Sequence, residues 1–265
     1  MCSPKIILVT GSNQGLGWGI IKVAALRDPA STYIMCTRKL EAGQEGIQKL
    51  RADGVTAKVD LLQLDVTSDA DITAAVKHVA DAYGKLDVLV NNAGVLSWAP
   101  KDDQPIAEVR AMYAKVVDVN LTSLAVVTHA FLPLLWKSAD PKVVGVSSGL
   151  GSIANTLTKK MGRTAPYGAS KIGMNGFSVH MQVKENDRVA AEKDGREPPS
   201  GRTPVRYFVC QPGVLKTALL NFYAAGREPE RGAEVAVRLA LDDKFTYEGG
   251  SYWEYEDEEM KRVPW

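Results

Sequence analysis

Short apolar runs alternate along this chain with longer segments in which apolar residues recur every three or four positions. The short runs are typical of strands buried on both faces, and the longer segments are typical of amphipathic helices. We expect strands at residues 5–10, 31–37, 59–64, 86–90, 142–146, 205–209 and 249–253. We expect helices at 20–26, 41–52, 69–83, 106–120, 121–136, 228–241 and from 167 to beyond 182. This alternation predicts an α/β fold, in which one doubly wound parallel sheet of about seven strands is flanked by helices.

The remaining segments give no sign of a second domain. We find no internal repeat, linker or second apolar core, so residues 1–265 are expected to form a single domain. A loop is expected at 150–166. The segment 184–204 is rich in charge, glycine and proline, which predicts the end of a helix followed by a polar surface excursion. The acidic run at 254–259 predicts a solvated tail.

The composition argues against several classes of function. The formal net charge is +1, so electrostatics favours neither nucleic acid nor a membrane surface as a partner. The apolar run at 6–9 is too short for a signal peptide or a membrane span. The cysteines form no spaced cluster and the histidines have no companions at ligand spacing, which predicts buried reduced thiols, no metal site and a cytoplasmic location. These residues are Cys2, Cys36, Cys210, His78, His129 and His180.

A glycine-rich turn follows the first predicted strand and leads into a helix. It comprises Thr10, Gly11, Ser12, Asn13, Gln14, Gly15, Leu16 and Gly17. Glycines in this context let the backbone approach a pyrophosphate, which then lies at the positive N-terminal end of the helix. The turn therefore predicts a dinucleotide site, with an ordinary strand-to-helix turn as the alternative.

The end of the second predicted strand bears on the choice of dinucleotide. An NAD site places an acidic residue there for the ribose 2′-hydroxyl, whereas an arginine accommodates a 2′-phosphate. This chain has Thr37 and Arg38 at that point and no acidic residue. Arg38 therefore predicts NADPH as the cofactor, and the alternative is a solvated charge at a strand end.

Tyr167 and Lys171 lie four residues apart, so they share one face if the segment is helical. An ammonium one turn away favours the phenolate and lowers the phenol pKa from its usual value of about 10, which suits proton exchange with a carbonyl. Two solvated surface residues are the alternative. Asn120 interrupts a long apolar helical run, where its amide either holds a local distortion and a water or is simply exposed.

Together these motifs resemble the short-chain dehydrogenase/reductase family across residues 5–253, and more loosely its monomeric carbonyl reductases. The motifs are the glycine turn, Asp65, Asn91-Asn92-Ala93-Gly94, Asn120, Ser148, Tyr167 with Lys171, and Pro212-Gly213 through Thr217. The resemblance implies a Rossmann fold with Asn120, Ser148, Tyr167 and Lys171 as catalytic residues. It also implies that the cofactor is bound by Gly11, Asn13, Gln14, Gly15, Leu16, Gly17, Arg38, Asp65, Val66, Asn92, Ala93, Gly94, Tyr167, Lys171, Pro212, Gly213, Leu215 and Thr217.

The resemblance also implies a role for each catalytic residue. Tyr167 would give its proton to the carbonyl oxygen as hydride arrives, while Lys171 would lower the tyrosine pKa and hold the nicotinamide ribose. Ser148 would hydrogen-bond the substrate oxygen, and it is preferred to its neighbour Ser147 because the family uses the second serine of such a pair. Asn120 would hold a water that links Lys171 to solvent.

Two features depart from the family pattern. The gap from Ser148 to Tyr167 is several residues longer than usual, which suggests a reshaped substrate mouth. Gln14 stands where many NADP-dependent members carry a basic residue, which leaves Arg38 as the main determinant of cofactor choice.

The leading hypothesis is an NADPH-dependent oxidoreductase that reduces a small-molecule ketone or aldehyde to an alcohol. Cyclisation or isomerisation at the same site is one alternative, and a non-catalytic nucleotide-sensing protein on the same fold is another. Trp98, Leu150, Phe222 and Tyr223 are expected to line an apolar mouth, unless they are core residues. The identity of the substrate and the choice between monomer and homo-oligomer stay open.

Overall fold

The structure, a computed structural model, describes residues 4–162 and 164–265. Its strands are β1 (Ile6–Val9), β2 (Thr32–Thr37), β3 (Lys58–Gln63), β4 (Val88–Asn91), β5 (Lys142–Val146), β6 (Arg206–Gln211), β7 (Ser251–Glu256) and β8 (Glu259–Arg262). Its helices are α1 (Gly15–Arg27), α2 (Leu40–Ala52), α3 (Asp69–Tyr83), α4 (Ile106–Val117), α5 (Ser123–Leu135), α6 (Ile153–Thr158), α7 (Ala165–Lys193) and α8 (Pro229–Ala240). Cys36 and Cys210 are buried free thiols, as predicted, whereas Cys2 lies outside the described residues.

One sheet contains these strands in the order β3-β2-β1-β4-β5-β6-β7-β8. Strands β1 to β7 pair in parallel, and β8 pairs antiparallel with β7 at one edge. The strand order reverses between β1 and β4, so their carboxyl ends flank the crevice in which open α/β sheets bind ligands. The predicted doubly wound α/β fold is therefore confirmed, with one strand more than the expected number.

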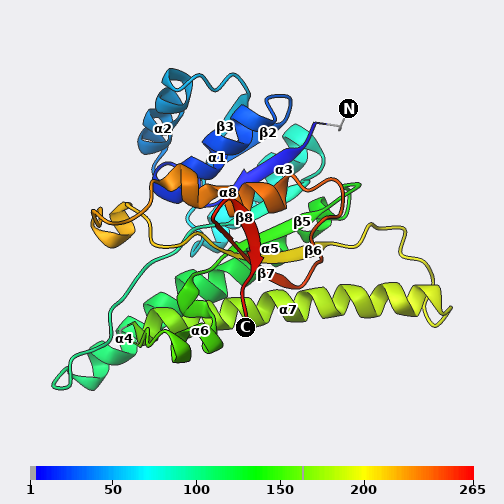
Figure 1. Ribbon diagram of the computed structural model, residues 1–265. Helices are drawn as coiled ribbons and strands as arrows, with labels where there is room; N and C mark the ends of the chain where they lie inside the picture. Colours follow the sequence, from blue (N-terminus) through cyan, green and yellow to red (C-terminus); the bar gives the residue numbers. More distant parts are fainter. Residues whose placement is uncertain (1–3, 163) are drawn as a thin grey trace.

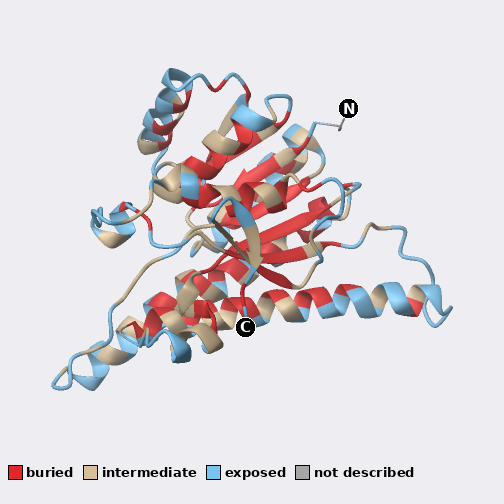
Figure 2. Cartoon of the chain, viewed as in Figure 1, coloured by how far each residue is buried: buried red, intermediate tan, exposed pale blue. Residues whose placement is uncertain are grey.

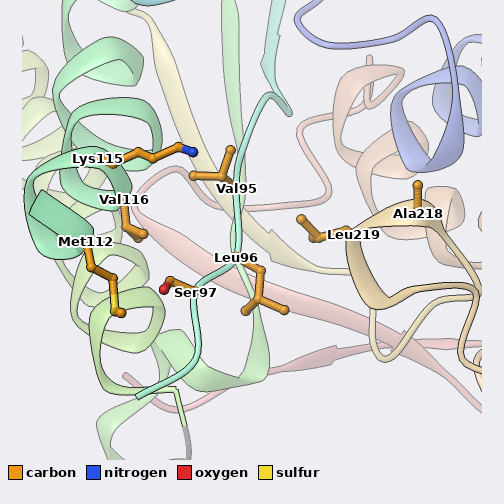
Figure 3. Close-up of a pocket in the computed structure, with 8 residues that line it drawn as sticks. All are labelled: Val95, Leu96, Ser97, Met112, Lys115, Val116, Ala218 and Leu219. Carbon is orange, nitrogen blue, oxygen red and sulfur yellow. The ribbon is translucent and has the colours of Figure 1, made fainter. Parts of the chain in front are cut away.

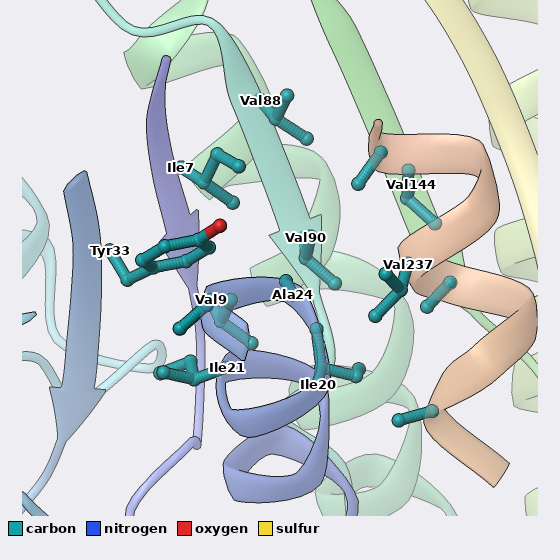
Figure 4. Packing of buried hydrophobic residues seen from close by; sticks show 14 of the residues in the cluster. Ile7, Val9, Ile20, Ile21, Ala24, Tyr33, Val88, Val90, Val144 and Val237 are labelled. Carbon is teal, nitrogen blue, oxygen red and sulfur yellow. The ribbon is translucent and has the colours of Figure 1, made fainter. Parts of the chain in front are cut away.

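Helices cover both faces of the sheet (Figure 1). Helices α1, α2 and α8 pack on one face, and α3, α5 and α7 pack on the other. Successive strand residues point to opposite layers: Ile7 and Val9 join the α1 layer, whereas Leu8 between them joins the other. In Figure 4, Ile20 and Ile21 of α1 lie against β1 and its neighbours. The strands are buried through the centre of the molecule (Figure 2), which makes their carboxyl ends a rigid base for a site.

The acidic run expected to be a solvated tail is part of the sheet. Strand β7 extends to Glu256, Asp257 and Glu258 form a turn with φ of 52° and 64°, and β8 returns along β7. Positive φ at both turn residues suits the twist of a two-residue hairpin. The acidic side chains alternate with Trp253 and Tyr255, which pack on the core. That alternation with a period of two is the strand signal, and the high charge obscured it.

The two helices expected at 106–120 and 121–136 are one continuous helical segment. A π-helical turn, η1 (Asp118–Thr122), joins α4 to α5, and Asn120 is buried within it at 1% exposure. The predicted local distortion is confirmed, and the exposed alternative is wrong. The segment Ile106–Leu135 is long and apolar enough to cross a membrane, but 44% of its most apolar stretch is buried inside the protein. Single π turns in α-helices occur frequently at functional sites.

The predicted loop at 150–166 contains regular structure, so that prediction was wrong in part. A short 3-10 turn, η2 (Gly149–Gly151), follows β5, and α6 comes directly after it. The Ser152 hydroxyl caps α6 by accepting a hydrogen bond from Asn155 N at 3.0 Å. The connection between Ser148 and Tyr167 therefore contains a 3-10 turn and a short helix.

The surface excursion expected at 184–204 begins ten residues later, because α7 continues to Lys193. Glu185 is buried in this part of α7 and pairs with Arg188 at 2.8 Å, so charge pairing along one helix face supports the extension. The excursion also packs more than expected, since the Arg202 guanidinium lies 4.2 Å from the ring centroid of Trp136.

Candidate active site

The glycine turn after β1 has the shape of a phosphate-binding turn. Gly11 and Gly15 have φ of +60° and +57°, a left-handed conformation that favours glycine. A Cβ at Gly17 would lie 2.5 Å from Asn92 Nδ2 and 2.7 Å from Gly11 O, so a larger residue does not fit. Helix α1 begins without a side-chain cap and without an acidic residue in its first turn. Its first N–H groups therefore suit an anion, and the turn fits a dinucleotide pyrophosphate.

The Asn-Asn-Ala-Gly turn after β4 clamps the glycine turn. Asn92 Nδ2 donates to the carbonyl oxygens of Thr10 at 2.9 Å and Gly11 at 3.0 Å. The Thr10 hydroxyl accepts hydrogen bonds from Asn92 N and Ala93 N, both at 3.0 Å. The Asn92 side chain thus holds the glycine turn in place through its backbone carbonyls, and the backbone of Ala93 and Gly94 is left to face the predicted cofactor site. Thr10 was named only as a member of the motif, although its hydroxyl joins the two turns.

Arg38 and Asp65 lie near each other at the ends of β2 and β3. Thr67 N and its hydroxyl donate to Asp65 Oδ1 at 3.0 Å and 2.7 Å, and these bonds lower the pKa of Asp65, with a smaller contribution from the Arg38 charge. Arg38 is exposed, and it forms no ion pair with any residue that the structure describes. Val66 lines a small hollow with Thr10 and Ala93. These positions suit the adenosine half of a dinucleotide, with Arg38 available for a phosphate.

Tyr167 and Lys171 share the buried face of α7, as predicted, with exposures of 8% and 4%. Lys171 Nζ donates to Val146 O at 2.7 Å and lies 5.6 Å from the ring centroid of Tyr167. Burial raises the pKa of Tyr167 to about 12, and the Ser148 hydroxyl opposes this effect. Burial lowers the pKa of Lys171 to about 8, which the Cys210 thiol partly opposes. The expected net lowering of the tyrosine pKa is therefore not found, because burial dominates and the ammonium is bonded to Val146 O.

Ser148 lies beside Tyr167, where the predicted role requires it. It directly precedes η2, and its hydroxyl also caps this turn by accepting a hydrogen bond from Leu150 N at 3.3 Å. Ser147 is buried and lies beside Tyr252 instead. The geometry therefore favours the second serine of the pair, although its catalytic role stays a prediction.

The Asn120 amide is already engaged by the protein. Asn120 Oδ1 accepts a hydrogen bond from Val95 N, and Asn120 Nδ2 donates to Val95 O. Asn120 Nδ2 also donates to Ser170 Oγ at 2.9 Å. A Cβ at Gly94 would lie 3.1 Å from Asn120 Oδ1 and 3.7 Å from Lys171 Nζ, so the turn after β4 and two predicted catalytic residues converge. The predicted water at this amide stays untested, and it would have to compete with these bonds. Ser170 was missed, although its place within the Tyr167–Lys171 turn was a usable signal.

The loop after β6 contributes residues in different ways. Thr217 is buried and its Cγ2 would lie 3.5 Å from a Cβ at Gly15, so it faces the glycine turn. The Leu215 side chain packs against α8 at Gly232, which leaves only its backbone for a bound molecule. Pro212 precedes Gly213, whose φ is +78°, and turns the chain away from β6. The structure thus brings Thr217 to the predicted cofactor site but turns the Leu215 side chain away from it.

A pocket of about 340 Å³ opens between the loop after β4, helix α4 and the loop after β6 (Figure 3). It is lined by Val95, Leu96, Ser97, Met112, Lys115, Val116, Ala218 and Leu219. Val95 is the residue bonded to Asn120, so the pocket adjoins the predicted catalytic residues. Lys115 is the charged member of an otherwise mostly apolar lining.

This pocket was not predicted from the sequence. Its signal was the spacing of Met112, Val116 and Asn120, which places the three on one helix face. Of the aromatic residues expected at the mouth, Trp98, Phe222 and Tyr223 are exposed at 62%, 64% and 56%, so they are not core residues. Leu150 is half-buried.

Comparison with known proteins identifies the family. A family model described as short chain dehydrogenase matches residues 5–227, so the chain belongs to the short-chain dehydrogenase/reductase family of oxidoreductases. An Aspergillus fumigatus protein named as a short-chain dehydrogenase/reductase is 51% identical and covers 99% of this chain and 98% of its own length. Mouse carbonyl reductase [NADPH] 1 is 29% identical over 90% of this chain and 91% of that protein. The crystal structure of NADPH-bound carbonyl reductase from chicken fatty liver superposes with a TM-score of 0.78 at 21% identity, and covers 100% of both chains.

Proposed function

We propose that this protein is an NADPH-dependent reductase that converts a ketone or aldehyde to an alcohol. The observation that carries this proposal is the meeting of the Tyr167 phenol, the Ser148 hydroxyl and the Lys171 ammonium beside a preformed dinucleotide turn. A bound reduced nicotinamide supplies the hydride. The net change adds this hydride to the carbonyl carbon and a proton to the carbonyl oxygen.

Tyr167 supplies that proton. A phenol with a pKa of about 12 is fully protonated near neutral pH, so it is ready to donate. Its donation is downhill toward an alkoxide, which is a stronger base than a phenolate. Ser148 donates a hydrogen bond to the same oxygen and stabilises the charge that develops there. Lys171 then offsets the charge left on the phenolate, and a buried ammonium acts strongly because little water screens it.

The residues of this chain support NADPH rather than NADH as the proposed cofactor. The glycine turn and the α1 N-terminus would bind the pyrophosphate, and exposed Arg38 would bind the 2′-phosphate bidentately. The names of two relatives support this choice, since mouse carbonyl reductase 1 and the chicken liver enzyme are both described with NADPH.

The pocket next to Asn120 indicates the character of the substrate. Its mostly apolar walls favour an apolar carbonyl compound, and Ser97 and Lys115 provide polar contacts at defined positions. Exposed Trp98, Phe222 and Tyr223 extend an apolar surface near the loops that line it. The proposed setting is the cytoplasm, where NADPH is available and buried thiols stay reduced.

The test is NADPH consumption by the purified protein with a panel of carbonyl compounds that vary in size and charge. We expect oxidation of NADPH with formation of the alcohol in equal amounts. Conversion of a compound without NADPH consumption would favour the cyclisation or isomerisation alternative. NADPH binding without conversion of any compound would favour the nucleotide-sensing alternative.

A further inference from the structure

The C-terminal segment returns to the predicted catalytic residues. Tyr252 on β7 is 1% exposed, and its hydroxyl donates to the backbone carbonyl of Ser148. The ring of Trp265 stacks on that of Tyr252, with centroids 5.4 Å apart and an interplanar angle of 28°. Trp265 O accepts a hydrogen bond from Ala154 N at 3.1 Å, at the start of α6. Figure 1 shows β8 leading the chain end back toward this part of the molecule.

The bond from Tyr252 adds a second donor to one carbonyl group. Ser148 O also accepts a hydrogen bond from Gly151 N at 2.7 Å, which closes the η2 turn. Two donors on one carbonyl restrict the rotation of the Ser148 backbone. Because a side chain follows its backbone, the same restriction aims the Ser148 hydroxyl at Tyr167.

The strand itself does not require the Tyr252 hydroxyl. The backbone of Tyr252 pairs in register with Val209 of β6, and its carbonyl accepts a hydrogen bond from Val263 N at 2.9 Å. The hydroxyl lies beyond these backbone bonds and reaches across to the end of β5. Its hydrogen bond to Ser148 is therefore separate from the backbone hydrogen bonds that hold β7 in the sheet.

We propose that Tyr252 is a positioning residue for Ser148 and that Trp265 holds Tyr252 in place. Tyr252 acts from behind Ser148 and takes no proton in the reaction. The longer connection between Ser148 and Tyr167, which contains η2 and α6, is anchored from the C-terminal side by the same two aromatic residues. The tests of this proposal that measure kcat or KM rest on the proposed reductase function.

Tyr33 of β2 offers a matched control in the other half of the sheet. It is also fully buried, and its hydroxyl also donates to a backbone carbonyl, that of Asp28 at 2.9 Å. Tyr252→Phe and Tyr33→Phe therefore remove the same kind of bond from the same kind of residue. A purely structural effect would be alike in the two variants.

The kinetic test compares these variants with NADPH and one carbonyl substrate. We expect Tyr252→Phe to lower kcat about two- to tenfold with an unchanged KM for NADPH, which is the range for one hydrogen bond. Tyr33→Phe should leave kcat unchanged. Trp265→Ala should resemble Tyr252→Phe, and Trp265→Phe should restore most of the loss because an aromatic ring is kept. Equal losses in the Tyr252 and Tyr33 variants would overturn the proposal.

A double-mutant cycle asks whether the effect passes through Ser148. Tyr252→Phe should cause no further loss in a Ser148→Ala background, since no hydroxyl remains to be aimed. The same fold loss in both backgrounds would reject the positioning role.

Hydrogen exchange provides a readout that needs no activity. Tyr252→Phe should speed exchange of the Gly151 amide, which shares the Ser148 carbonyl, whereas Tyr33→Phe should not. A wild-type protein that oxidises no NADPH with any carbonyl compound would refute the proposed function, yet this contrast would still stand. Unchanged exchange at Gly151 in Tyr252→Phe would refute the positioning role by itself.

Discussion

Asn120 and Val95 form two hydrogen bonds across the pocket wall: Val95 N donates to Asn120 Oδ1 at 2.8 Å, and Asn120 Nδ2 donates to Val95 O at 2.9 Å. A side-chain amide here replaces a backbone partner, because the chain after β4 leaves the sheet. The π-helical turn η1 places this amide at the required position. One residue thus connects the fold of the long helix to the shape of the proposed substrate pocket.

Asn120→Asp should destabilise the protein by about 1–3 kcal/mol, the range for leaving a buried polar group unsatisfied. The substitution keeps the shape of the side chain, but a carboxylate cannot donate to Val95 O or to Ser170 Oγ. Urea unfolding measures the difference in free energy. Asn186→Asp on the outer part of α7 is the control, and equal effects at both positions would contradict the assigned role of Asn120.

Tyr167→Phe should abolish turnover while NADPH binding stays intact. General acid catalysis contributes about 10²–10⁴-fold, and the variant loses the only proton donor that we assign. Turnover is followed as NADPH oxidation, and binding as the change in NADPH fluorescence. Tyr33→Phe removes a buried phenol that is not among the proposed site residues and should leave turnover unchanged. A kcat for Tyr167→Phe within tenfold of wild type would remove Tyr167 from the mechanism.

Lys171→Met should change how stability depends on pH. The pKa of Lys171 is about 8 in the folded protein against 10.5 in a model compound, so between these values the unfolded chain binds more protons. The wild type should therefore gain stability relative to the variant from pH 8 to pH 10, by about 2–3 kcal/mol. Below pH 8 Lys171 is protonated in both the folded and the unfolded protein, so the full free-energy cost of burying its ammonium lowers the stability of the wild type. Unfolding of both proteins without cofactor at pH 7 and pH 10 tests this, and a constant difference would contradict it.

The same Lys171→Met variant should also bind NADPH more weakly and turn over more slowly, because one ammonium is assigned two tasks. Lys184→Met on the outer part of α7 serves as the control for loss of a lysine.

Arg38→Ala should reduce the preference for NADPH over NADH by about ten- to a hundredfold in kcat/KM. A hydrogen bond to a charged group contributes about 1.5–3 kcal/mol, and a guanidinium binds a phosphate bidentately. Lys39→Ala is a matched control, since Lys39 is the next residue and is also exposed. If the wild type uses NADH as well as NADPH, Arg38 is only a solvated charge.

Thr37→Asp combined with Arg38→Ala should reverse the preference, because a carboxylate repels the 2′-phosphate. Thr37 is buried, and its hydroxyl accepts a hydrogen bond from Lys39 N at 3.3 Å, which an aspartate oxygen can also accept. All comparisons should be made at one ionic strength, since salt screens surface charge.

Lys115→Met should discriminate between acidic and neutral carbonyl substrates. The substitution removes the charge but keeps an unbranched apolar stem in the pocket. Because Lys115 is exposed, its ion pair with a substrate carboxylate contributes up to about 1 kcal/mol, or about fivefold in kcat/KM. Neutral substrates should be unaffected, and Lys101→Met, which lies outside the pocket lining, should change neither class. An equal loss for both classes would mean that Lys115 only shapes the pocket.

The sequence by itself determined most of the architecture. Buried strands need continuous apolar runs, and amphipathic helices need a repeat of three to four residues, so both can be read over a few positions. The glycine turn is local for the same reason, since it requires positive φ at Gly11 and Gly15 and small volume at Gly17. The shared face of Tyr167 and Lys171 follows from helix geometry alone.

The sequence did not predict secondary structure correctly where high charge concealed the period of a strand or where a helix was short. The alternation of Trp253 and Tyr255 with acidic residues was the signal that β7 continues, but an acidic run is usually solvated. Helix α6 has fewer than two turns, so it has too few apolar positions to be recognised.

Only the tertiary structure decided the pKa values at the site and the distant contacts that hold its residues in place. The pKa of Tyr167 depends on burial by every surrounding element, and this effect outweighs the ammonium that the sequence placed one turn away. The bond between Tyr252 and Ser148 joins residues 104 positions apart. No local pattern encodes such a contact, because it depends on the order of the strands in the folded sheet.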